Sequence, residues 1–186
     1  KAFDLSWCST NVQNFWAVYL MASRRSSNKV EKDKFHLVFC PTQKWHRAAD
    51  LWRTDDTPQP ILTGYFYLPF RTNNANNSWP YNSRGIGGWH FKRKLGGEFR
   101  NAPILIDMLQ GQGSTANEGA NATWYVQDPV SRKTVTSASH PGARGAPTGG
   151  NFLFEDGHVE WIQRQRIKIG SSAGSWLCFY KIDVPQ

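Results

Sequence analysis

Bulky apolar residues recur at every second position on both sides of Asp156-Gly157, in residues 151–163 (NFLFEDGHVEWIQ). A period of two is typical of a β-strand with one buried face. An Asp-Gly pair between two such runs favours a two-residue type I′ turn. This segment therefore predicts a β-hairpin that bends at Asp156-Gly157.

Five further runs have the aromatic and β-branched composition of short strands. They are residues 35–40 (FHLVFC), 62–70 (LTGYFYLPF), 103–108 (PILIDM), 123–126 (TWYV) and 176–182 (WLCFYKI). The third run is apolar up to Asp107, which predicts a buried strand that ends at this carboxylate. Residues 71–88, 110–122 and 137–151 are rich in Gly, Asn, Ser or Pro, and we expect long loops there.

Residues 10–23 have a helical period instead, with an apolar face made by Val12, Phe15, Trp16, Tyr19 and Leu20. The predicted fold class is therefore α+β, with one N-terminal helix packed on an antiparallel β-sheet with long loops. A length of 186 residues fits a single domain, 1–186. In this scheme residues 1–25 contain the end of the helix and residues 35–186 form a β-rich head.

Composition narrows the class of protein. The chain has 22 Lys and Arg against 14 Asp and Glu, a net charge of +8, with 19% charged and 14% aromatic residues. A disordered chain would have more charge and fewer aromatic residues. The longest nearly apolar run, residues 15–22, is far shorter than the roughly 18–20 residues that a membrane-spanning helix needs.

The three cysteines, Cys8, Cys40 and Cys178, are too few for a disulfide framework, and their spacing fits no zinc motif. Two interpretations stay open. One is a single disulfide with one buried thiol, and the other is three small buried hydrophobic residues. The pairing cannot be chosen from sequence.

Residues 140–162 (HPGARGAPTGGNFLFEDGHVEWI) resemble the C-terminal signature of prepilin-type, pseudopilin-like proteins, in which a His, nine residues and Asp-Gly follow one another. Residues 35–45 (FHLVFCPTQKW) resemble the Phe-x-Cys-Pro element of that family, at 39–41. Residues 100–110 (RNAPILIDMLQ) resemble its Pro-x-x-x-Asp strand, at 103–107. The aromatic run GYFYLPF between them resembles its Tyr-rich strand. The resemblance spans about residues 10–162 in the same order.

The sequence departs from the family pattern at two places. Fifteen residues separate His140 from Asp156, so either a six-residue Gly/Pro insertion lengthens the loop or His140 is not the equivalent His. The family's leader and long apolar helix, with a Glu near its start, are also missing. We expect Lys1 to lie after that apolar part, so that residues 10–23 are the end of the pilin helix.

The resemblance implies a pilin-like head and a non-catalytic subunit of a type IV pilus-like or type II secretion filament. Its partners would be other pilin or pseudopilin subunits, and it would touch the membrane only through the missing N-terminal helix. It would be periplasmic or extracellular, anchored in the inner membrane before assembly. No cofactor is expected, apart from a calcium ion as one alternative.

The calcium alternative rests on Asp107, His140 and Asp156, because some major pseudopilins bind calcium in a C-terminal loop and oxygen-rich loops suit this ion. The favoured interpretation is structural. In it Asp156 supplies a residue of the turn with positive φ, and Asp107 and His140 hydrogen-bond the backbone to hold the loops. The chain has no D-x-D-x-D calcium loop.

Catalytic motifs are absent: we find no G-x-S-x-G, H-E-x-x-H or P-loop, so we do not expect an enzyme. The carboxylates of Glu155 and Glu160 flank the predicted turn and would approach each other as a glycosidase pair does. A solvated hairpin face is the favoured interpretation.

Two groups of residues suggest binding surfaces. Alternation along a strand would present three basic side chains on one face, where they would bind an acidic polysaccharide, nucleic acid or an acidic neighbouring subunit. We favour a solvated face and do not expect nucleic acid as a partner. The loop NNANNSWPY would hold sugar by stacking, and the alternative function is a secreted carbohydrate-binding module. The residues are Trp79 and Tyr81 for sugar, and Lys92, Arg93, Lys94, Arg164, Arg166 and Lys168 for the basic surface.

Overall fold

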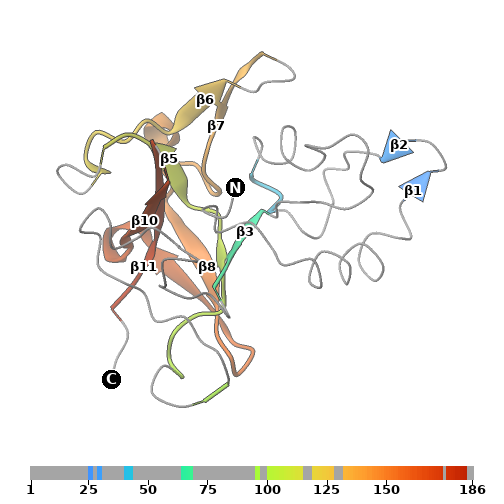
Figure 1. Ribbon diagram of the computed structural model, residues 1–186, viewed down its shortest axis with the longest axis vertical. Helices are drawn as coiled ribbons and strands as arrows, with labels where there is room; N and C mark the ends of the chain where they lie inside the picture. The colour runs from blue at the N-terminus through green and yellow to red at the C-terminus, as the bar shows by residue number, and fades with distance from the viewer. Residues whose placement is uncertain are drawn as a thin grey trace.

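The fold is described from a computed structural model (Figure 1). The structure describes residues 40–43, 64–68, 95–96, 100–114, 119–127, 132–173 and 175–183, and the backbone of residues 25–26 and 29–30. For residues 171–173 likewise only the backbone is described.

These residues form short strands joined by turns. The strands are β1 (Arg25–Ser26), β2 (Lys29–Val30), β3 (Tyr65–Tyr67), β4 (Leu105–Asp107), β5 (Gln110–Gln112), β6 (Tyr125–Gln127), β7 (Thr134–Thr136), β8 (Gly149–Leu153), β9 (Val159–Gln163), β10 (Lys168–Ala173) and β11 (Trp176–Lys181). Two single-turn 3₁₀ helices, η5 (Ala143–Gly145) and η6 (Arg164–Arg166), lie between them.

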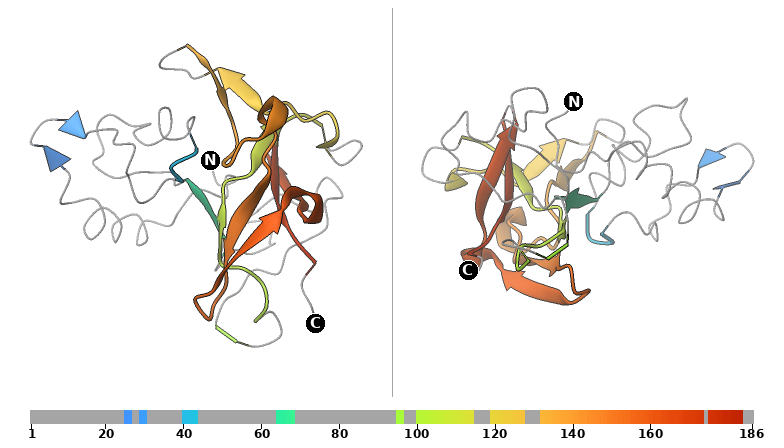
Figure 2. Two further views of the ribbon diagram at one scale, coloured as in Figure 1. Left: turned by 180° about the vertical axis from the view of Figure 1, so that it is seen from behind. Right: turned by 60° about the horizontal axis from the view of Figure 1, so that its bottom comes forward.

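Two antiparallel sheets make up the body of the fold. One has the strand order β3-β4-β8-β9 and the other the order β10-β11-β5. The pairs β1-β2 and β6-β7 form separate two-stranded ribbons. Figures 1 and 2 show the β1-β2 ribbon at a distance from the two larger sheets.

The two larger sheets share one hydrophobic core. Phe66, Ile106 and Phe152 from the first sheet are fully buried, together with Phe179 and Tyr180 from the second. The ring of Phe66 meets that of Tyr180 edge-on, with centroids 6.2 Å apart. Each sheet therefore covers the apolar face of the other.

The chain passes directly from one sheet to the other between β4 and β5. Only Met108 and Leu109 separate these strands, and both are buried. The Leu109 carbonyl accepts a hydrogen bond from the Phe179 amide (2.8 Å), which ties this short connection to the second sheet. Asp107, the last residue of β4, is thus fixed at the junction of the two sheets.

The predicted α+β fold with a helix packed on a sheet is wrong. The described residues are mostly β-strand (45%) in antiparallel sheets, and among them no helix reaches seven residues. Residues 10–23, where the helix was expected, lie outside the described residues. The physical reason is that sheet packs on sheet, so the described core is closed without a helix.

The predicted hairpin is confirmed as β8-β9, but its turn differs from the expected type I′ turn. The Phe154 amide donates to the His158 carbonyl (3.0 Å) and the Gly157 amide to the Phe154 carbonyl (3.1 Å), so residues 155–157 form a three-residue loop. Gly157 has a φ of +89°, whereas Asp156 is not among the residues with positive φ. Such loops need one left-handed residue, and glycine supplies it.

Strands predicted at 62–70, 103–108 and 176–182 are confirmed in shortened form as β3, β4 and β11, and the strand predicted at 123–126 overlaps β6, which ends one residue later. By contrast, β5 lies where a loop was predicted over 110–122. A Cβ on Gly111 would lie 3.0 Å from the indole of Trp124, which packs on this strand. Glycine permits that close approach, and its presence made the strand resemble a loop.

Candidate functional site

Three polar side chains from distant parts of the chain meet beside β4. Cys40 precedes a turn at 41–42, Asp107 ends β4, and His140 lies in the Gly/Pro-rich segment before β8. The Cys40 Sγ atom is 3.5 Å from His140 Nε2, and His140 Nε2 is 2.9 Å from Asp107 Oδ2. We call these residues the Cys40–Asp107–His140 cluster.

The position of Asp107 follows from the sheet. Ile106 on β4 pairs with Phe152 on β8, so the next residues, Asp107 and Asn151, face each other. Asp107 Oδ2 accepts hydrogen bonds from the Asn151 amide nitrogen (2.6 Å) and side-chain Nδ2 (2.8 Å). Because Asp107 is only 3% exposed, its carboxylate depends on these donors for its stability.

His140 is held by its backbone as well as its ring. Its φ is +51°, in the left-handed region. Its amide donates to Thr42 Oγ1 (2.9 Å), its carbonyl accepts from the Thr148 amide (3.0 Å), and its ring meets Trp161 edge-on at 4.9 Å. Two separate segments therefore fix an uncommon backbone conformation, and this directs the imidazole toward Asp107.

The contacts within the cluster shift the pKa values of His140 and Cys40 in opposite directions. The hydrogen bond to Asp107, followed by that to Cys40, raises the pKa of His140 to about 10. Burial raises the pKa of the Cys40 thiol, but hydrogen bonds with His140 and Thr42 outweigh it and the pKa is lowered. At neutral pH a protonated imidazole therefore lies between a buried carboxylate and an acidified thiol.

This geometry differs from that of a thiol nucleophile. In catalytic triads the nucleophile and the acid bind opposite ring nitrogens of the His, so that the ring can take a proton from one side while the acid orients the other. Here Cys40 and Asp107 both approach Nε2. Cys40 is also only 3% exposed, which restricts the access of a substrate to its sulfur. The arrangement suits ligation or structural support better than nucleophilic attack.

The structure brings together two of the three residues predicted as calcium ligands. Within the described residues the group that could hold a metal is Cys40, Asp107 and His140, and Asp156 is not part of it. Asp156 lies on the exposed hairpin turn, where its Oδ1 accepts from the His158 amide (3.0 Å) and from the His158 ring (Nδ1, 2.6 Å). The backbone hydrogen bond, followed by that from the ring, lowers the pKa of Asp156.

Sequence reasoning missed Cys40 as the third member. The signal was present in the Phe-x-Cys-Pro element, but no spacing rule connects that element with Asp107 or His140. Cys40 and Cys178 are free thiols and both are buried, whereas Cys8 lies outside the described residues.

The basic surface predicted on one strand face is not formed by Arg164, Arg166 and Lys168. The first two lie in η6, and the third begins β10. The Arg164 guanidinium is half-buried, 4.3 Å from the centroid of the Phe179 ring, and burial lowers its pKa. The strand prediction is therefore wrong, because Arg164 packs inward on an aromatic ring instead of alternating with its neighbours.

The other two basic residues have acidic neighbours. Arg166 Nη1 lies 3.5 Å from Glu160 Oε1, and Lys168 Nζ lies 3.4 Å from Asp183 Oδ1. Several remaining candidates lie outside the described residues, namely Trp79, Tyr81, Lys92, Arg93 and Lys94.

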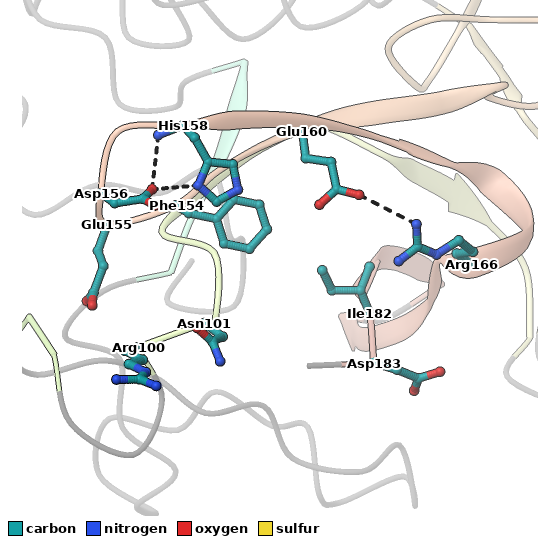
Figure 3. Close-up of a pocket in the computed structure, with 10 residues that line it drawn as sticks. All are labelled: Arg100, Asn101, Phe154, Glu155, Asp156, His158, Glu160, Arg166, Ile182 and Asp183. Atoms are coloured by element: carbon teal, nitrogen blue, oxygen red, sulfur yellow. Dashed lines mark hydrogen bonds and ion pairs between the residues drawn. The ribbon is translucent and has the colours of Figure 1, made fainter. Parts of the chain in front are cut away.

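A pocket of about 420 Å³ lies beside the hairpin and contains the predicted carboxylate pair (Figure 3). Figure 3 shows Glu155 and Glu160 pointing in different directions, with Glu160 turned toward Arg166. Glu155 Oε2 instead accepts a hydrogen bond from the Gly96 amide (2.9 Å). The two carboxylates have separate partners and do not form the facing pair that glycoside hydrolysis uses.

In the described part of the chain no helix has the length and apolar character needed to cross a membrane. Comparison of the whole chain with protein-family models, curated proteins and solved structures finds no significant match. The function therefore has to be argued from the residues and their geometry.

Proposed function

We propose that this chain is a non-catalytic subunit of a secreted filament of the type IV pilus-like or type II secretion kind, which assembles with other such subunits outside the inner membrane. The observation that carries the proposal is the Cys40–Asp107–His140 cluster. Three of the four segments that carry the family resemblance contribute one member each to it.

The convergence matters because the segments are far apart in the sequence. Cys40 is 100 residues from His140, and Asp107 is 33 residues from it. The third segment also supplies Asn151, which donates twice to Asp107. Chance matches to a family pattern would have no reason to contact one another, whereas the parts of one structural signature would.

The altered spacing before Asp156 has a structural counterpart. Pro141 and Pro147 form a β-bridge, the Gly142 amide donates to the Ala146 carbonyl (2.7 Å), and residues 142–147 thus close on themselves. His140 and Thr148 at their two sides are hydrogen-bonded to each other. Without residues 142–147 the spacing from His140 to Asp156 is 15 − 6 = 9 residues, as in the family. This supports the insertion and favours His140 as the equivalent His.

One surface offers a contact for a neighbouring subunit. Strand β9 is at the edge of its sheet, and Val159 and Trp161 on it are 59% and 43% exposed. Apolar side chains on an unpaired edge strand favour contact with another protein. A contact surface of this kind supports a role in assembly.

A photo-crosslinking experiment tests the proposal. A photoreactive phenylalanine derivative replaces Val159 in the complete gene in its own host, and surface filaments are sheared from irradiated cells. We expect a ladder of cross-linked species in the filament fraction, and none without irradiation. A protein found only as a free monomer, absent from the membrane and filament fractions, would contradict the proposal.

A further inference from the structure

We propose that Cys40, Asp107 and His140 form a binding site for a zinc-type transition-metal ion, with Sγ, Oδ2 and Nε2 as ligands and water in the fourth position. The proposal goes beyond filament assembly and stands on the geometry of the cluster alone.

The two separations that involve His140 Nε2 are close to those of a tetrahedral ion, and all three ligand atoms lie within 4.8 Å of one another. Two ligands at about 2.3 Å (S) and about 2.05 Å (N) from zinc are about 3.6 Å apart at a tetrahedral angle. The observed distance between Cys40 Sγ and His140 Nε2 is 3.5 Å. Nitrogen and oxygen ligands would be about 3.3 Å apart, so the 2.9 Å between Nε2 and Asp107 Oδ2 must open by only about 0.4 Å.

A bound metal ion explains why Cys40 Sγ and Asp107 Oδ2 both approach the same nitrogen, His140 Nε2. A single proton on Nε2 can be directed at the carboxylate or at the sulfur, but not fully at both, whereas a metal ion binds all three atoms at once. In the metal-free cluster the Nε2 proton lies between the atoms that bind the ion in the metal-bound cluster. Metal binding therefore displaces the Nε2 proton of His140, and also the thiol proton of Cys40 where it is still present.

The surroundings of the cluster supply the second set of contacts that metal sites need. Asn151 donates two hydrogen bonds to Asp107 Oδ2 and so orients the carboxylate. Thr42 Oγ1 lies 3.0 Å from Cys40 Sγ and accepts a hydrogen bond from the His140 amide. Thr42 therefore positions both Cys40 and His140. The His140 side chain is 21% exposed and that of Asp107 4%, so the cluster lies at the edge of the core, where His140 meets solvent.

The ligand types decide which metal fits. A thiolate and an imidazole suit zinc and its neighbours, whereas calcium takes six to eight oxygen ligands. The described cluster offers one carboxylate, and Asp156 lies elsewhere. The proposal therefore replaces the calcium site predicted at Asp107, His140 and Asp156 with a zinc site in which Cys40 takes the third position.

Cobalt titration of the chelator-treated chain is the first test. Bound at the cluster, Co²⁺ should give a thiolate-to-metal charge-transfer band in the near ultraviolet and the strong visible bands of four-coordinate cobalt. The titration should saturate at one ion per chain, and Zn²⁺ should then remove the bands. At a hundredfold excess over its dissociation constant, Zn²⁺ should raise the melting temperature by about 5–10 °C.

Matched cysteine variants locate the site. In a Cys8→Ser background, Cys40→Ser should abolish the charge-transfer band, whereas Cys178→Ser, which removes the other buried thiol, should retain it. Asn151→Ala keeps all three ligands and should weaken zinc binding about 10- to 100-fold through loss of carboxylate orientation.

A measurement on the unsubstituted chain covers the case in which Cys40→Ser does not fold. Zinc should slow alkylation of Cys40 by iodoacetamide, as read by mass spectrometry, more than it slows alkylation of Cys178, which follows the opening of the fold alone. The proposal is overturned if cobalt gives no thiolate band, if the band persists in Cys40→Ser, or if zinc does not protect Cys40.

Discussion

Replacement of Asp107 by alanine should destabilise the fold more than any other single change at the cluster. Asp107 Oδ2 accepts three hydrogen bonds, from Asn151 N, Asn151 Nδ2 and His140 Nε2, at 2.6–2.9 Å. The substitution leaves the Asn151 amide without this acceptor and the protonated His140 without its carboxylate. The perturbation is thus the loss of one buried charge on which three donors depend.

The magnitude follows from the burial and charge of that carboxylate. A hydrogen bond to a charged group contributes about 1.5–3 kcal/mol, and such contributions within one network do not add fully. Removal of one partner from a buried pair costs about 3–5 kcal/mol. Since Asp107 is only 3% exposed, we expect a loss of that size, near 4 kcal/mol, in the free energy of unfolding.

Equilibrium unfolding in urea, with a chelator present, measures this loss as a lower midpoint at an unchanged m-value. Asp156→Ala is the control, because within the described residues that exposed carboxylate is hydrogen-bonded to its neighbour His158, and its midpoint should hardly move. A double-mutant cycle of Asp107→Ala with His140→Ala should give a coupling of about 1–3 kcal/mol. A midpoint for Asp107→Ala close to that of the control, or no coupling to His140, would refute this account of the cluster.

Three further outcomes are expected. Because the pKa of His140 in the fold, about 10, lies above its ordinary 6.5, the stability from its proton is complete below pH 6.5 and lost as pH rises toward 10. Unfolding of the metal-free protein at several pH values should show this decline, and His140→Gln should lack it. Gly149→Ala should cost about 1–3 kcal/mol in urea unfolding, since its Cβ would overlap the Ile162 carbonyl and the Trp161 ring; a neutral result would contradict that packing. Deletion of residues 142–147 should keep the hairpin and change the free energy of unfolding by no more than about 1 kcal/mol, because that segment closes on itself; a chain that fails to fold would show that the segment is part of the core.

Alternation of apolar residues was enough to predict the hairpin, and a continuous apolar run was enough to predict the strand that ends at Asp107. Neither pattern predicted β5 (Gln110–Gln112). Its polar and glycine residues form a buried strand because the Trp124 ring covers Gly111. The predicted α+β fold class was wrong because the helical pattern at residues 10–23 was expected to form a helix that covers the sheet. In the described residues that cover comes from a second sheet, in which β5 consists of polar and glycine residues and the pairing of β10 with β11 has register shifts, so the sequence shows no regular alternation over the whole sheet.

Two of the three residues of the cluster, Asp107 and His140, were predicted as site residues from the sequence. Asp107 at the end of an apolar run required a buried partner, and His140 was singled out by its motif. Cys40 was not connected with them, because its contact with His140 arises from the path of the chain across 100 residues and from no local pattern. The left-handed backbone of His140, which aims the ring, is likewise fixed by the distant Thr42.

The short passage from β4 to β5 has a consequence for how the molecule opens. The chain passes between the two sheets through Met108 and Leu109 and again through η6, and the buried residues of both sheets form one core, so we expect neither sheet to melt while the other keeps its order. Amide hydrogens on the two sheets, such as those of Asn151 and Phe179, should therefore exchange with solvent deuterium through one common opening event. The junction makes the two larger sheets a single cooperative unit, so mechanical or thermal stress is resisted by both sheets together.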